Sequence, residues 1–103
     1  MCCPPPGAAL DLAMLGMGVA RFKALSDATR LGIVALLAAS AEPICVCEFT
    51  ASFALEQPTI SHHLKLLRDA GLIVSERRGS WAYHSLHPER EGWVRATLAG
   101  LAG

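Results

Sequence analysis

Apolar side chains recur along the first quarter of the chain at three- and four-residue steps, the spacing that gathers side chains on one face of a helix. This spacing predicts a helix over residues 8–25. The members of its apolar face are Leu12, Leu15, Val19 and Phe22. Three consecutive prolines precede it, at positions 4–6. Because proline disfavours both helix and sheet pairing, residues 1–7 are expected to form a flexible arm.

Two more helices are predicted before the middle of the chain. Ser26 and Asp27 form a favourable N-cap for the first of them, which ends before Pro43. The side chains predicted to face the core from this helix are Leu31, Val34, Ala35 and Ala38. A short third helix is expected from about Cys45 to about Ala54.

A fourth helix is predicted to begin at Gln57, with Pro58 in its first turn and Gly71 as its C-terminal cap. Its buried face is predicted to consist of Ile60, Leu64 and Leu67. Steps of 100° per residue place a polar set on the opposite face, namely Pro58, Ser61, His62, Lys65 and Asp69. Thr59 and His63 fall on the flanks between the two faces.

Two strand-like runs follow at residues 72–76 and 80–86, where apolar and polar side chains alternate. We expect Arg77, Arg78 and Gly79 to form the tip of a hairpin between them. The basic residues at this position give the hairpin a positive end.

A last helix is predicted to begin at residues 87–89 and to end near Leu101. The order of elements is therefore four helices, a hairpin and a helix. This order predicts a mainly α fold with a small β-hairpin, the winged helix-turn-helix.

A helix with short polar side chains at its N-terminal end fits the major groove of DNA, where such side chains reach base edges. The candidates on the fourth helix are Gln57, Thr59, Ser61, His62 and, on the flank, His63. The candidates for phosphate contacts are Lys65, Arg68, Arg77 and Arg78. The alternative interpretation is a solvated helix face beside a soluble turn, with His63 as a half-buried structural residue.

Composition adds a second subunit to this picture. The 103 residues fit one domain, residues 8–103, after the arm. Hydrophobic residues make up 52% of the chain. Because so small a chain has little interior, this content predicts apolar surface buried in a homodimer.

Charge is unevenly distributed although its formal net value is zero. Residues 1–56 carry three Lys/Arg and five Asp/Glu, whereas residues 57–103 carry six Lys/Arg and four Asp/Glu. The basic half contains the predicted fourth helix and hairpin, where a nucleic-acid surface is expected.

The sequence also bears on the compartment. No apolar run reaches the ~20 residues needed to span a bilayer, and residues 1–6 lack the basic and apolar regions of a signal peptide. We therefore expect a cytoplasmic protein with no membrane partner. Thiols stay reduced there, so the four cysteines are expected as metal ligands or reactive thiols rather than as disulfides.

Three stretches resemble the ArsR/SmtB family of metal-sensing repressors: residues 22–31, 57–73 and 76–83. The second, QPTISHHLKLLRDAGLI, is similar to the family's recognition helix, and the similarity spans roughly residues 19–98. It implies a repressor without enzymatic activity, a dimer closed by the first and last helices, and a twofold-symmetric double-stranded operator. The chain departs from the family at Glu56, where relatives often have serine as the helix cap.

Cys45 and Cys47 lie at the predicted start of the third helix. Inside a helix, side chains two residues apart point apart, but at a helix entrance both sulfurs can converge on one ion. The helix N-terminus favours the thiolate, which binds soft metal ions. The run ICVCEF resembles the family's Cys-Val-Cys-Asp-Leu sensing motif. The alternative is that both cysteines are small buried apolar residues.

The resemblance extends the candidate metal ligands to Cys2 and Cys3, because vicinal cysteines before prolines resemble the arms of arsenic-responsive relatives. Some relatives have a third cysteine near this pair, and Thr50 occupies that position in this sequence. Three thiolates suit As(III) or Sb(III) as the inducer, and four suit Cd(II), Pb(II) or Zn(II). The family implies that the ion-free dimer holds its operator and that ion capture releases it. No organic cofactor is expected.

The family's other metal site, built from Asp and His on the last helix, finds no match. Residues 88–103 contain no histidine. His84 and His87 precede that helix and are expected as surface or wing residues.

Three other functions stay open. The same repressor can sense oxidation of its thiols. A thiol-redox enzyme is disfavoured, because the chain has Cys-x-Cys rather than Cys-x-x-Cys and lacks the strand–helix alternation of a thioredoxin-like sheet. A protein-interaction module would use the same helices without DNA.

Overall fold

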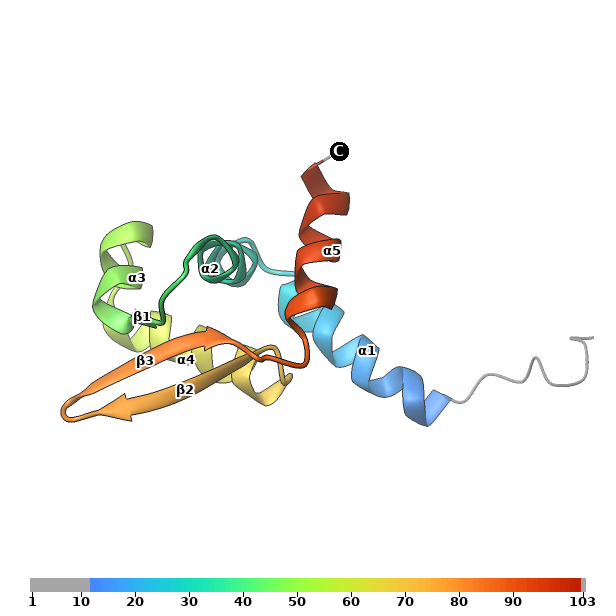
Figure 1. Cartoon of the computed structure of the whole chain (residues 1–103), viewed down its shortest axis with the longest axis horizontal. Coiled ribbons are helices and arrows are strands. Elements are labelled where there is room, and N and C mark those ends of the chain that lie inside the picture. Colours follow the sequence, from blue (N-terminus) through green and yellow to red (C-terminus); the bar gives the residue numbers. More distant parts are fainter. Residues whose placement is uncertain (1–11, 103) are drawn as a thin grey trace, which may run out of the picture.

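The computed structural model describes residues 12–102. The predicted arm, residues 1–7, and the predicted start of the first helix at residue 8 lie outside them. The described part is a mainly helical chain with one hairpin, as predicted (Figure 1). Its elements are α1 (Leu12–Leu25), α2 (Ala28–Ala39), β1 (Ile44–Cys45), α3 (Val46–Phe53), α4 (Gln57–Asp69), β2 (Ile73–Arg78), β3 (Trp81–Leu86) and α5 (Glu91–Ala102).

The hairpin of β2 and β3 projects from the helices as a long ribbon (Figure 1). The predicted tip is wrong, because both arginines belong to β2 and Arg78 pairs with Trp81. The turn consists of Gly79 and Ser80. Gly79 has a φ of 63°, a left-handed conformation that suits a two-residue hairpin turn and that glycine adopts without a steric penalty.

The two-residue strand β1 lies along the other edge of β3 and completes a sheet in the order β1–β3–β2. The sequence pattern does not predict it, because two residues are too few to show an alternation. Ile44 pairs with His84, and Cys45 pairs with Tyr83. The entrance to α3 is therefore attached to the hairpin through backbone pairing.

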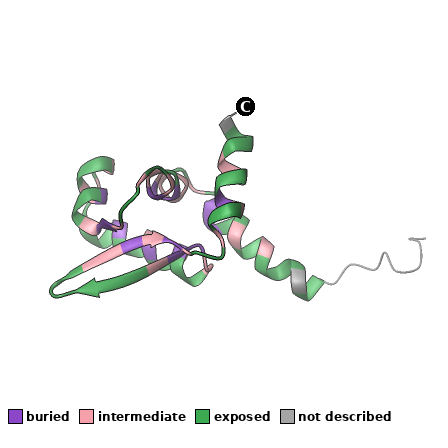
Figure 2. Cartoon of the chain, viewed as in Figure 1, coloured by how far each residue is buried: buried purple, intermediate pink, exposed green. Residues whose placement is uncertain are grey.

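The core lies where α2, α3 and α4 meet the base of the hairpin and α5 (Figure 2). Its largest fully buried side chains are Phe49, Ile33, Ile60, Leu67, Leu72, Ile73, Val34 and Val94. The predicted buried face of α4 is confirmed, since Ile60, Leu64 and Leu67 are at most 2% exposed. Each such side chain contributes roughly 1.5–3 kcal/mol by leaving water.

Two predicted details of the helices are wrong. The buried residues of α2 are Ile33, Val34 and Leu37, whereas Ala35 is exposed. Alanine removes little apolar area from water, so the larger side chains determine which face packs. The last helix begins at Glu91, because the three residues before it form a turn.

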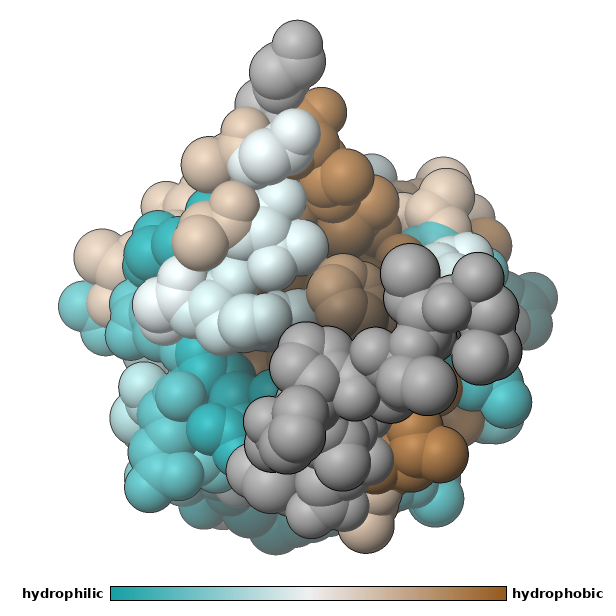
Figure 3. Space-filling model, turned by 90° about the vertical axis from the view of Figure 1, so that its right-hand side faces the viewer, coloured by the Kyte–Doolittle hydropathy of each residue, from teal (hydrophilic) through white to brown (hydrophobic). Residues whose placement is uncertain are grey.

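Large apolar side chains stay exposed at the end of the molecule where α1 and α5 lie. Those at least 47% exposed on these two helices are Leu12, Leu15, Met17, Val19, Phe22 and Leu101. Figure 3 views this end and shows hydrophobic surface there. The Phe22 ring meets the Trp93 ring edge-on at 5.4 Å between centroids, which links α1 to α5. No helix within residues 12–102 is long and apolar enough to cross a membrane.

Candidate nucleic-acid interface and cysteine pair

The helix α4 presents its predicted polar face to solvent. Proline lies in its first turn, and its cap residue Glu56 makes no side-chain capping bond. Gly71, at a φ of 76°, ends the helix, and the Leu72 N–H donates to the Leu67 carbonyl. The exposed candidates on this helix are Gln57, Thr59, Ser61, His62, Lys65 and Arg68. These side chains are therefore available to a partner.

A hollow of about 290 Å³ separates α4 from the hairpin. It brings together four predicted interface residues, Gln57, Ser61, Arg68 and Arg77. Trp81, which sequence reasoning did not single out, lines the same hollow, and the residue is 55% exposed. Its position next to the turn is the signal that identifies it, because a large aromatic at a hairpin tip has no core to enter.

Arg77 and Arg78 lie on opposite faces of the hairpin, since side chains alternate along a strand. Arg77 points to the side of α4 and lines the hollow. Arg78 lies over the Tyr83 ring, 4.9 Å from its centroid, and pairs with Glu76 at 3.4 Å. The structure thus brings Arg77, and not Arg78, together with the α4 candidates.

Lys65 forms an exposed ion pair with Asp69 one turn further along α4, at 2.9 Å. The hydrogen bond from Lys65 holds the pKa of the Asp69 carboxyl below its usual value. Because exposed ion pairs contribute little, Lys65 can exchange this partner for a phosphate.

His63 has the structural role that the sequence leaves open as the alternative. Its side chain is 15% exposed, and its Nδ1 lies 3.1 Å from Nη1 of Arg30 and 3.9 Å from the Asp27 carboxylate. Asp27 caps α2 by accepting from the Arg30 N–H, a bond that lowers the pKa of its carboxyl. His63 is therefore tied to α2 rather than gathered into the hollow.

His84, predicted as a surface or wing residue, lies in β3 of the hairpin but is not on the surface. The residue is 4% exposed, and its Nδ1 lies 2.7 Å from the Ser75 hydroxyl. Burial, and secondly the charge of Arg68, hold the pKa of His84 below its ordinary value. Alternation along β3 turns this side chain inward, because its neighbours Tyr83 and Ser85 face the other side. His87 is half-buried and accepts from the Glu89 N–H.

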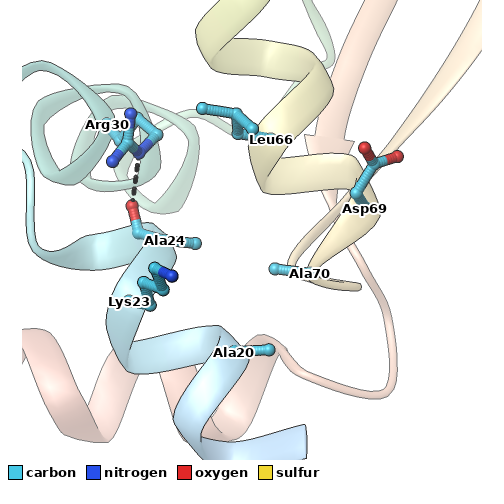
Figure 4. A pocket seen from close by; sticks show the side chains of 7 residues that line it. All are labelled: Ala20, Lys23, Ala24, Arg30, Leu66, Asp69 and Ala70. Carbon is cyan, nitrogen blue, oxygen red and sulfur yellow. Dashed lines mark hydrogen bonds between the residues drawn. The ribbon is translucent and has the colours of Figure 1, made fainter.

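A second hollow, of about 280 Å³, lies between α1, α2 and α4 (Figure 4). Its lining is mostly apolar, with charged groups among it: Ala20, Lys23, Ala24, Arg30, Leu66, Asp69 and Ala70. Two of these lining residues are joined, since Arg30 Nε donates to the Ala24 carbonyl at 2.7 Å. No predicted site residue lines this hollow, so it is separate from the candidate interface.

Cys45 and Cys47 meet at the entrance to α3, as predicted from the non-helical backbone there. Cys45 is extended, with φ −84° and ψ 159°, and buried, whereas Cys47 is exposed in the first turn. The structure joins the two as a disulfide with Cα atoms 5.5 Å apart, which departs from the expectation of free thiols. Because Cys45 precedes the helix, its side chain does not diverge from that of Cys47 as it would inside a helix.

Further ligands near this pair are absent from the described residues. No group of three or more His, Cys, Asp or Glu within residues 12–102 is placed to hold a metal ion. The hydroxyl of Thr50 donates to the Cys47 carbonyl at 2.8 Å and caps that backbone group. The candidates Cys2 and Cys3 lie outside the described residues.

Known proteins similar to this chain are transcriptional regulators by name. The chain is 48% identical over 80 residues to the arsenic resistance transcriptional regulator ArsR1 of Pseudomonas putida, covering 78% of this chain and 62% of that relative. It is 36% identical over 76 residues to the arsenical resistance operon repressor of Staphylococcus xylosus, covering 74% of this chain and 71% of that relative. The chain thus spans less than two thirds of the first of these proteins.

The fold also matches solved structures. The homodimeric winged helix-turn-helix DNA-binding domain Mb0332 from Mycobacterium bovis superposes with a TM-score of 0.77 at 26% identity, over 88% of this chain and 82% of that chain. A family model described as bacterial regulatory protein, arsR family, matches residues 27–75. The chain therefore belongs to the arsR family of bacterial regulatory proteins and has the winged helix-turn-helix fold.

Proposed function

We propose that the chain is a transcriptional repressor that binds operator DNA through α4 and the hairpin. The observation that carries this proposal is the shared hollow, where polar side chains of α4 and its cationic Arg68 lie opposite Arg77 of the hairpin. Gln57, Thr59, Ser61 and His62 contact base edges in the major groove. Lys65, Arg68 and Arg77 neutralise phosphates and fix the register. Such a regulator acts in the cytoplasm, where the DNA is.

Two copies of the chain bind one operator. The exposed apolar side chains of α1 and α5 support a homodimer closed by these helices, because contiguous apolar surface is costly in a monomer. The similar domain Mb0332 from Mycobacterium bovis is described as a homodimer, which favours the same assembly here. A twofold axis then presents two α4 helices to two half-sites.

The inducing signal is a thiophilic ion, with As(III) or Sb(III) as the first candidate. Cys45 and Cys47 fit such an ion, because their sulfurs already converge and Cys47 is exposed to solvent. After reduction to thiolates they supply two soft ligands. The arsenic-related names of the relatives favour this signal.

The remaining ligands come from Cys2 and Cys3 of the arm. One of them completes the three thiolates that suit As(III) or Sb(III), and both complete the four that suit Cd(II), Pb(II) or Zn(II). Ion capture at Cys45 and Cys47 weakens operator binding, and by linkage operator weakens ion capture by the same factor.

Thiol oxidation is a second candidate signal, favoured by the disulfide between Cys45 and Cys47. When this disulfide forms, the two thiols give two electrons and two protons to an oxidant such as a peroxide. A thiol-redox enzyme and a protein-interaction module without DNA are disfavoured, because the similar proteins are named as transcriptional regulators.

A gel shift with the upstream DNA of the chain's own gene tests the proposal. Reduced wild-type protein is expected to bind this duplex and to release it when arsenite is added. Cys45→Ser and Cys47→Ser are expected to bind equally well and to remain bound in arsenite. Antimonite, cadmium, lead, zinc and a peroxide in parallel lanes identify the signal. If the serine variants release DNA as the wild type does, the assignment of the cysteines is wrong.

A further inference from the structure

A hydrogen-bonded chain of three side chains runs from the recognition helix into the core. Nη1 of Arg68 on α4 lies 3.2 Å from the hydroxyl of Ser75 on β2. That hydroxyl lies 2.7 Å from Nδ1 of His84 on β3. Among residues 12–102, His84 is the buried polar residue, with 4% exposure. The chain thus links an exposed cation to a buried imidazole.

The chemistry of the three groups determines which of them donates and which accepts in each hydrogen bond. A guanidinium has only donors, so Ser75 accepts from Arg68 and keeps its own proton to donate to Nδ1 of His84. Burial and the nearby Arg68 disfavour a charged imidazole. In the neutral tautomer that carries its proton on Nε2, Nδ1 accepts the hydrogen bond from the Ser75 hydroxyl. Ser75 therefore connects the exposed guanidinium of Arg68 to the buried imidazole of His84 through two hydrogen bonds.

His84, the buried end of these hydrogen-bonded side chains, contacts the segment that holds the cysteines. His84 pairs through its backbone with Ile44, and the adjacent Tyr83 pairs with Cys45. The imidazole also lies 6.2 Å from the ring of Phe49 on α3, centroid to centroid. A shift of β1 or of the first turn of α3 therefore acts directly on His84.

We propose that His84 and Ser75 form a relay that couples the state of the Cys45–Cys47 pair to Arg68 on α4. The inference rests on the proposed function and adds the path by which the cysteine pair reaches the DNA-binding surface. The relay positions Arg68 and touches neither the ion nor the DNA. Loss of the Ser75 hydroxyl disconnects Arg68 from the cysteine segment and leaves both ends intact.

The test compares Ser75→Ala, Ser75→Thr and the control Ser85→Ala in the full chain. Ser85 lies in the same sheet on β3, opposite Val74, and its side chain takes no part in the relay. Each reduced protein is titrated with the fluorescent upstream duplex of its own gene, with and without arsenite. The ratio of the two dissociation constants measures the coupling, and arsenite binding is followed separately by thiolate absorption.

The wild type is expected to show a ratio of about 5 to 150. Ser75→Ala should lower this ratio about 2- to 30-fold while arsenite binding is retained. Ser75→Thr should restore the ratio because it keeps the hydroxyl, and Ser85→Ala should keep it. A wild-type ratio retained in Ser75→Ala overturns the relay alone. A wild type that shows no arsenite effect overturns the proposed function together with the relay.

Discussion

Arg30 of α2 donates a hydrogen bond from Nη1 to Nδ1 of His63 on α4 over 3.1 Å. Because arginine carries only donors, this nitrogen of His63 holds the lone pair. The same guanidinium donates from Nε to the Ala24 carbonyl near the end of α1. One side chain therefore joins three helices and fixes the orientation of α4.

Replacing Arg30 by alanine is expected to lower the free energy of unfolding by about 1–3 kcal/mol, because two partly buried acceptors lose a charged donor. Denaturant titration measures this change. Arg90→Ala is the matched control, since its side chain bonds to the carbonyl of the adjacent Glu89, and its effect should stay within about 0.5 kcal/mol. Equal effects of the two variants would contradict the structural role of Arg30.

The hairpin arginines are expected to differ in their effect on DNA binding. Arg77→Ala should weaken binding of the upstream duplex and reduce the slope of log affinity against log salt by about 0.9, the value for one lost phosphate contact. Arg78→Ala should change the slope less, because Arg78 lies over the Tyr83 ring on the opposite face. Anisotropy titrations at several salt concentrations measure both slopes. A larger loss of DNA affinity for Arg78→Ala than for Arg77→Ala would contradict the assignment of the Arg77 face of the hairpin to DNA.

Trp81→Ala is expected to weaken DNA binding without lowering the stability of the fold. The residue is 55% exposed, so removal of its side chain should leave the unfolding midpoint almost unchanged while weakening DNA binding. Phe49→Ala, in contrast, removes a fully buried ring and should cost about 3–5 kcal/mol. Thermal melts combined with duplex titration distinguish the two. Unchanged DNA affinity in Trp81→Ala would remove this residue from the interface.

The buried His84 predicts a loss of stability in mild acid. Its pKa in the folded chain is lowered from the ordinary value of 6.5, first by burial and then by Arg68. Below that pH the unfolded chain binds a proton that the folded chain does not, so the contribution is present above pH 6.5 and is lost as the pH falls through 6.5 towards the folded pKa.

His84→Gln isolates this contribution. Denaturant titrations from about pH 7.5 to about pH 5 should show a steeper decline for the wild type, by at most about 1.4 kcal/mol per pH unit. The same decline in both proteins would assign the acid sensitivity to other groups.

Apolar surface on α1 predicts the assembly. Val19 is 63% exposed, so Val19→Glu should leave the fold intact and convert a dimer into a monomer. Sedimentation velocity at micromolar concentration measures the change. Ser52→Glu, on the exposed side of α3, is the control and should remain dimeric. A wild type that sediments as a monomer would contradict the dimer.

Periodicity predicts much of the fold because the large apolar side chains of α4 repeat with the helical period. Ile60, Leu64 and Leu67 are buried as expected, and the opposite polar residues are exposed. The cap at Asp27 follows from local hydrogen bonding and is also confirmed. These features depend on neighbours within about one helical turn, which a sequence displays directly.

Features that depend on distant pairing are not predicted. The burial of His84 results from its register with Ile44 and Ser75, which local pattern does not reveal. The opposite orientations of Arg77 and Arg78 follow from the position of the turn, which begins at Gly79, two residues later than expected, and leaves both arginines in β2. The disulfide between Cys45 and Cys47 depends on the chain's entry into α3. In each case tertiary context overrides a local preference.

Protection of guanine N7 from dimethyl sulfate tests the central claim most directly, because N7 lies in the major groove. On the upstream duplex, reduced protein is predicted to protect two clusters of guanines with centres about 10–10.5 base pairs, or a multiple of that, apart. Arsenite should abolish this protection in the wild type and leave it in Cys47→Ser. Unprotected guanines in the ion-free state, or protection that persists in wild type with arsenite, would contradict the account.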